Sequence, residues 1–115
     1  AFFLCCDVNK LSGLDDTKFD CVIYSHVVEI LESPETSLRE ALKFSNKIII
    51  RFFEPPVFDV DCVELRIMNL GKDNVPYLRR KMSKDYYSMI LAKLGCKEVT
   101  VYRDISTDEV HVLNF

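Results

Sequence analysis

The sequence has 115 residues, 49% of them hydrophobic, and its 15 basic and 18 acidic side chains give a formal net charge of -3. This size predicts one compact domain covering residues 1–115, because the chain is long enough to bury one core and too short for two. The negative balance disfavours nucleic acid as a partner, and no apolar run approaches the roughly 18 residues that would span a bilayer, so we expect a cytoplasmic protein with no membrane partner.

The chain carries five cysteines, an odd number, together with a substantial aliphatic fraction. They lie mostly within apolar runs, which predicts reduced and buried side chains rather than disulfides. No Cys-x-x-Cys pair occurs, and neither histidine lies at a recognisable ligand spacing from a cysteine pair, so we predict no metal site. The cysteines are Cys5, Cys6, Cys21, Cys62 and Cys96.

Two buried strands are expected near the start of the chain. Phe2 to Cys6 is a continuous apolar run, which is typical of a strand buried on both faces, and the polar stretch 8–18 predicts a loop. Cys21 to Tyr24 is the second strand, again apolar without alternation. After Ser25-His26, the segment Val27 to Leu31 predicts one or two helical turns.

A helix is then predicted from Pro34, because Ser33 is a good N-cap and proline suits the first helical position. The next strand runs from Lys47 to Phe53, and Glu54-Pro55-Pro56 ends it, since proline cannot donate to a sheet ladder. Four carboxylates around the helix are interpreted as an exposed face with no pair positioned for acid-base work: Glu29, Glu32, Glu35 and Glu40.

In the second half of the chain, the sequence predicts defined helices and strands only after residue 82. Residues 57–76 receive no assignment beyond a turn at 71–74, and the basic cluster 77–81 is interpreted as a solvated segment leading into a helix rather than a phosphate-binding patch. Ser83 can cap that helix and Gly95 can end it. Val99 to Tyr102 and Val110 to Leu113 predict an antiparallel strand pair.

The order of these elements predicts an α/β fold. Alternation of strands and helices in the first half favours parallel pairing, and the last two strands are close enough for a hairpin. We therefore expect a Rossmann-like, mostly parallel sheet with an antiparallel C-terminal strand pair.

The segment FDCVIYSHVVEILESPETSLREALKFSNKIIIRFF, residues 19–53, resembles class I methyltransferases that use S-adenosylmethionine. In that family, a Phe-Asp precedes an apolar strand, a Pro-led helix follows, and an Ile-rich strand comes next. Residues 82–96 resemble the family's helix that ends in Leu-Gly-Cys, and residues 98–115 resemble its reversed terminal hairpin. The likeness covers nearly the whole chain, but only the family's later half.

The resemblance implies S-adenosylmethionine as the cofactor and Asp7, Val8, Ser25 and His26 as residues that line its site. Ligands of open α/β sheets bind outside the carboxyl ends of the strands, where backbone groups are free. Asp7 matches the adenine-contacting position of the family, and its interpretation as an ordinary turn residue stays open. For His26 a structural role is favoured over that of a general base.

Three departures from the family pattern bear on function. The Gly-x-Gly-x-Gly turn and the acidic ribose-binding residue are absent from the sequence, and Ile30 replaces a common histidine. Glu54-Pro55-Pro56 differs from the Asp/Asn-Pro-Pro-aromatic motif of amino-group methyltransferases, because it follows the wrong strand and Val57 replaces the aromatic. We therefore expect an incomplete methyltransferase-like domain, a fragment or truncated version of a longer protein.

Two functions follow from this interpretation. The first is methyl transfer from S-adenosylmethionine to an unknown acceptor, in the context of a longer parent chain. The second is a non-catalytic module that self-associates through an exposed sheet edge. For that edge we expect that Phe2 to Cys6 covers the strand 21–24, or that two chains pair there as a homo-oligomer.

Overall fold

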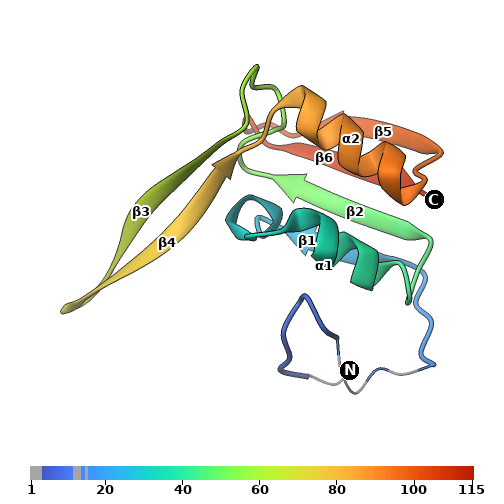
Figure 1. The fold of residues 1–115 in the computed structure, drawn as a ribbon, viewed down its shortest axis with the longest axis horizontal. Coiled ribbons are helices and arrows are strands. Elements are labelled where there is room, and N and C mark those ends of the chain that lie inside the picture. Colours follow the sequence, from blue (N-terminus) through green and yellow to red (C-terminus); the bar gives the residue numbers. More distant parts are fainter. Residues whose placement is uncertain (1–3, 12–13, 15) are drawn as a thin grey trace.

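The computed structural model describes residues 4–11, 14 and 16–115, and in them a four-stranded sheet carries two helices while a two-stranded ribbon projects from one end (Figure 1). The strand order of the sheet is β1-β2-β6-β5. None of the helices in this described part is long and apolar enough to cross a membrane. The sheet strands are β1 (Val22–Ser25), β2 (Lys47–Phe52), β5 (Glu98–Arg103) and β6 (Glu109–Asn114).

The direction of strand pairing confirms the expected α/β class. β1 pairs with β2 in parallel, with Val22 opposite Ile48, and the connection between them contains a helix, as parallel pairs require. β6 pairs antiparallel with both β2 and β5, which confirms the predicted C-terminal pair. β6 thus inserts between β2 and β5, so the last strand of the sequence is central in the sheet.

Both predicted helices form, and their caps are the expected ones. α1 (Pro34–Ala41) begins after Ser33, whose hydroxyl accepts a hydrogen bond from the Thr36 amide at 3.3 Å. α2 (Lys84–Leu94) begins after Ser83, whose hydroxyl accepts from the Tyr86 amide at 3.0 Å. Gly95 ends α2 with a φ of 80°, a left-handed conformation that favours glycine.

The core lies between the helices and one face of the sheet. Along β2 the residues alternate, and Ile48, Ile50 and Phe52 are fully buried. On this face, Tyr24 of β1 donates a hydrogen bond from its hydroxyl to the Ser37 carbonyl of α1. Tyr87 of α2 packs on Phe52. The opposite face is uncovered around β1, where Ile23 is 64% exposed.

The segment before β1 differs from the prediction. Residues 2 and 3 of the expected strand Phe2 to Cys6 lie outside the described residues, and residues 4–6 are irregular rather than extended in a ladder. Leu4 is 47% exposed, so this part of the run lacks the burial that stabilises a strand. Within the described residues β1 is therefore an edge strand, and residues 4–6 do not cover it.

The unassigned region forms a β-hairpin. β3 (Cys62–Leu70) and β4 (Asp73–Lys81) pair antiparallel across a turn at Gly71 and Lys72, where Gly71 has a φ of 63°. Residues 77–81 precede a helix as expected, but they are the end of β4, and the largely buried side chains of Arg79 and Arg80 contradict the expectation of a solvated segment. Pro76 hid this strand in the sequence, since proline is confined to edges, and both strands of a free hairpin are edges. After β1, the predicted helical turns are a short 3-10 helix, η1 (Val28–Ile30).

Candidate functional site

The candidate site is the edge of the sheet where β1 and β2 end. Because these strands are parallel, Ser25-His26 and Phe53-Glu54 emerge from the same edge. β6 runs the other way, so Asp108, just before its first residue, comes to this edge as well. The three strand ends thus bring together residues that are distant in the sequence.

His26 is fixed at this edge by backbone and side-chain contacts. Its φ is 54°, an uncommon conformation for a residue other than glycine, and its amide donates to the Arg51 carbonyl at 3.0 Å. Its Nε2 lies 2.9 Å from Asp108 Oδ2, and the ring meets the Phe53 ring edge to face at a centroid distance of 5.9 Å. Since an ionised carboxylate only accepts, this contact is a hydrogen bond in the tautomer of His26 that carries its proton on Nε2.

Arg51 joins the same network from β2. Its Nε donates to Asp108 Oδ2 at 3.0 Å, and its Nη2 donates to Asp104 Oδ2 at 2.6 Å. The His26 hydrogen bond, followed by that of Arg51, lowers the pKa of Asp108, while the Ile105 amide and then Arg51 lower the pKa of Asp104. These bonds tie the loop between β5 and β6 to the edge of the sheet.

Glu29 is a further residue of this edge, and sequence reasoning missed it. It is 2% exposed, so its assignment to an exposed helical face is wrong. Its Oε1 accepts from the Phe53 amide at 2.6 Å and from the Glu54 amide at 3.4 Å, where the chain leaves β2. The available signal was its position between Val28 and Ile30 in an apolar segment directly after a strand.

Of the predicted cofactor residues, Val8 lies against β1. The Val8 carbonyl accepts a hydrogen bond from Ser37 Oγ of α1 at 3.2 Å. Ser37 Oγ also lies 2.9 Å from the hydroxyl of Tyr24 in β1, so Val8 is connected through α1 to the strand. A shallow cavity of about 160 Å³ opens here. Its lining residues are mostly apolar: Val8, Leu11, Val22, Ile23, Tyr24 and Val27.

The other predicted residues flank this cavity. Ser25 and His26 lie in the chain between the lining residues Tyr24 and Val27. Asp7 accepts from the Asn9 amide at 2.8 Å, a turn interaction, and it precedes Val8. Val8 therefore shares a pocket with the residues on either side of Ser25-His26, while the role of all four residues in binding stays a prediction.

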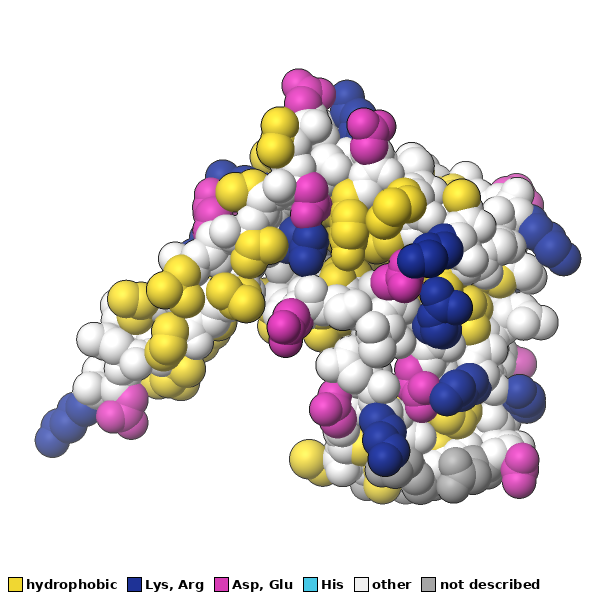
Figure 2. Space-filling model, viewed as in Figure 1, with side chains coloured by type: hydrophobic (Ala, Val, Ile, Leu, Met, Phe, Trp, Pro, Cys, Tyr) yellow, Lys and Arg dark blue, Asp and Glu magenta, His cyan; other side chains and the backbone are white. Residues whose placement is uncertain are grey.

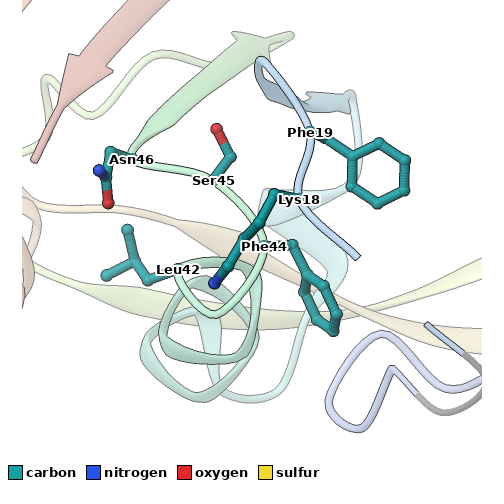
Figure 3. Close-up of a pocket in the computed structure, with 6 residues that line it drawn as sticks. All are labelled: Lys18, Phe19, Leu42, Phe44, Ser45 and Asn46. Atoms are coloured by element: carbon teal, nitrogen blue, oxygen red, sulfur yellow. The ribbon is translucent and has the colours of Figure 1, made fainter. Parts of the chain in front are cut away.

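A second pocket, of about 250 Å³, lies at the opposite end of the sheet (Figure 3). Lys18 and Phe19 come from the segment that enters β1, and Ser45 and Asn46 come from the segment that enters β2. Both segments precede their strands, so this pocket lies at the amino ends of the parallel pair. Ligands of α/β sheets bind at the other end, and we assign no function to it.

The basic cluster of β4 is engaged within the fold. Arg79 pairs with Glu54 at 3.4 Å and stacks over the Phe53 ring at 4.9 Å. Arg80 pairs with Asp61 and stacks over the Tyr86 ring at 4.7 Å. Both side chains are nearly buried, at 12% and 13% exposure, and so they do not form an open phosphate-binding surface.

The structure describes all five cysteines. All five cysteines are free, but Cys5 and Cys62 are exposed, which contradicts their assignment as buried side chains. Burial raises the pKa of Cys96. Within the part of the chain that the structure describes, no three His, Cys, Asp or Glu side chains are grouped to hold a metal ion.

Comparisons with known proteins agree with this fold. Residues 1–46 match the family described as Methyltransferase domain, and no curated protein matches the chain significantly. The N-terminal domain of EvdMO1, solved in the presence of SAH and D-fucose, superposes with a TM-score of 0.61 at 16% identity over 95% of this chain and 52% of that one. The glycopeptide N-methyltransferase MtfA, complexed with sinefungin, gives 0.60 at 10% identity over 94% of this chain and 57% of that one.

The fold is thus the α/β fold that the sequence resemblance implied. The chain spans about half the length of the solved structures that it matches. It resembles a partial methyltransferase domain, and the family match falls on its first 46 residues.

Proposed function

We propose that the chain is part of a methyltransferase that uses S-adenosylmethionine. The observation that carries this proposal is the family match to residues 1–46, because that segment contains all four predicted cofactor residues, Asp7, Val8, Ser25 and His26. The likeness to MtfA, which was solved with S-adenosyl-L-methionine, adds support from the fold. The acceptor of the methyl group is unknown.

The cavity beside β1 suits one portion of such a cofactor. Apolar walls with a few polar groups at the rim are typical of small-molecule sites, and Asp7 and Ser25 adjoin the walls here. The glycines of the described part lie outside this cavity, because Gly71 is in the turn of the hairpin and Gly95 ends α2. We propose that the described residues hold the nucleoside portion and that a longer parent chain holds the amino acid portion.

The residues at the strand ends would orient the reacting groups. S-adenosylmethionine, when bound, supplies a methyl group that is already activated on a sulfonium. The protein therefore needs mainly to align an acceptor and exclude water. His26, held by Asp108 and by the Arg51 carbonyl, and Phe53, positioned by Glu29, form a fixed wall on that side.

Titration of the 115-residue chain with S-adenosylhomocysteine, followed by calorimetry, tests the proposal. We expect micromolar binding that Val27→Asp weakens at least tenfold, because this change places a charge in the apolar cavity. Ile105→Asp, at an exposed position of the β5–β6 loop, is the matched control and should leave binding unchanged. Binding that is absent up to millimolar ligand, in this chain and in the parent chain, would contradict the proposal.

The second candidate is a non-catalytic interaction module. It is favoured by the edge strand β1, which within the described residues pairs on one side only and so offers backbone groups to a neighbour. A homo-oligomer that pairs through β1 would form whether or not S-adenosylhomocysteine is present, because this module binds no cofactor. Absence of cofactor binding together with a stable oligomer would favour this candidate over the enzyme.

A further inference from the structure

The hairpin β3–β4 exposes large apolar side chains on one of its faces. Figure 2 shows hydrophobic side chains gathered along this projecting arm. Residues directly opposite each other share a face, and Leu65 is opposite Leu78 while Ile67 is opposite Pro76. Leu65 is 71% exposed and Ile67 is 65% exposed, which is unusual for large aliphatic residues in a strand.

The apolar part of this face, which we call the ribbon face, lies in the middle of the hairpin. It comprises Val63, Leu65, Ile67, Pro76 and Leu78, with Arg80 on the same face at the base and Asn69 and Asn74 on it near the tip. Charged residues of the same stretch, Glu64, Arg66 and Arg79, lie on the other face and pair with one another and with Glu54. Near the base, the charged side chains of that other face are thus paired within the fold, and towards the tip it carries the exposed Met68, Leu70 and Val75. The apolar side chains of the ribbon face are exposed along the middle of the hairpin.

A free two-stranded ribbon is at best marginally stable in water, so this face needs a cover. Its five side chains expose on the order of 450–500 Å² of surface, within the 300–600 Å² of the largest patch on a typical monomer, where such patches are often functional. Two such faces, if fully covered, would together bury about 900–1,000 Å², close to the lower limit for a specific interface. A second copy of the same ribbon therefore supplies as much apolar surface as a weak dimer requires.

The charges around the ribbon face argue against a charged partner. The tip carries one charge of each sign, Lys72 and Asp73, and the base carries Arg80, which is already paired with Asp61. A nucleic acid or an anionic membrane would need an excess of basic groups beside the apolar residues. A neutral, apolar partner of the same shape fits better.

We propose that two copies of this chain associate by packing their ribbon faces against each other. The arrangement is isologous, so each ribbon presents the same residues to its partner and the tip of one lies towards the base of the other. Two ribbons packed face to face lie about 10 Å apart, which is the spacing of stacked sheets. Because the buried area is small, we expect a dissociation constant of about 1–100 µM.

Sedimentation velocity of the 115-residue chain from 1 to 300 µM tests this inference. We expect the mean mass to rise from one chain towards two. Leu65→Thr combined with Ile67→Thr should raise the dissociation constant at least 100-fold, because each change occurs twice in a symmetric interface. Threonine keeps the strand propensity of the hairpin, so the fold should remain intact.

The matched control combines Ile23→Thr with Ile105→Thr, two exposed apolar positions on the open sheet face and on a loop. This variant should associate like the unmodified chain. A mass of one chain at 300 µM would overturn the inference, and so would a control that loses association while the ribbon variant keeps it. If the ribbon variant fails to fold, hydrogen exchange of residues 63–78 in the unmodified chain decides, since protection must increase with concentration.

Discussion

The buried carboxylate of Glu29 provides the sharpest test of how the strand-end site is built. It accepts hydrogen bonds from two consecutive amides, those of Phe53 and Glu54, at the point where the chain leaves β2. A hydrogen bond to a charged group contributes about 1.5–3 kcal/mol, and the second, longer bond contributes less. We therefore expect Glu29→Ala to lower the free energy of unfolding by about 3 kcal/mol, because it leaves both amides without a partner.

Glu29→Gln separates charge from geometry. Both amides donate to the same oxygen, and the glutamine carbonyl can still accept from them, so only the contribution of the charge is lost. We expect a loss of about 1 kcal/mol, from one third to one half of that of the alanine variant. Urea unfolding followed by circular dichroism measures both values.

Glu32→Ala is the control, since this glutamate is exposed and three residues away. It should change the free energy of unfolding by less than about 0.5 kcal/mol. Hydrogen exchange adds a local measurement: the amides of Phe53 and Glu54 should exchange faster in Glu29→Ala than in the control. Equal stability of Glu29→Ala and Glu32→Ala would refute the role that we assign to this carboxylate.

Three other predictions concern the end of α2, the core and the hydrogen-bond network at the strand ends. Gly95→Ala should cost about 1 kcal/mol in urea unfolding, because alanine is strained at a φ of 80° although no neighbour lies within 4 Å of the added carbon. Tyr87→Phe should cost about 1 kcal/mol by the same assay, because it removes the 2.8 Å bond to His111 Nδ1 in the core. Asp108 has a lowered pKa, so its contribution to stability is present above the unfolded value of about 3.9 and is lost as the pH falls through the folded value. Asp108→Asn should therefore flatten the decline of stability below about pH 4, and an unchanged decline would contradict the network with Arg51.

The elements with strong local signals were predictable from the sequence. The cap at Ser33, the proline at the start of α1 and the stop at Gly95 each act within one turn of the helix that they define. The strands Val22–Ser25 and Lys47–Phe52 followed from apolar runs without alternation. These features depend on neighbours in the sequence, so the sequence alone specifies them.

The parts that escaped prediction depend on distant contacts. Asp108 meets His26 across 82 positions, and the burial of Glu29 depends on amides more than 20 residues away. The hairpin was missed because Pro76 and the interleaved charges obscure its alternation, and the stretch from Leu4 to Cys6 has an apolar sequence without the strand partner that would make it extended. Position at the end of an apolar strand was enough to place Ser25 and His26, but not to find what they touch.

The place of β6 in the sheet has a consequence for synthesis of the chain. β2 cannot pair with β6 (Glu109–Asn114) until about 60 further residues have been translated, and closing such a long loop slows the pairing. During translation, β2 therefore exposes an unpaired edge to other nascent chains and to chaperones until its partner leaves the ribosome. Deleting the last seven residues should accordingly leave a product that aggregates in the cell rather than a smaller folded protein.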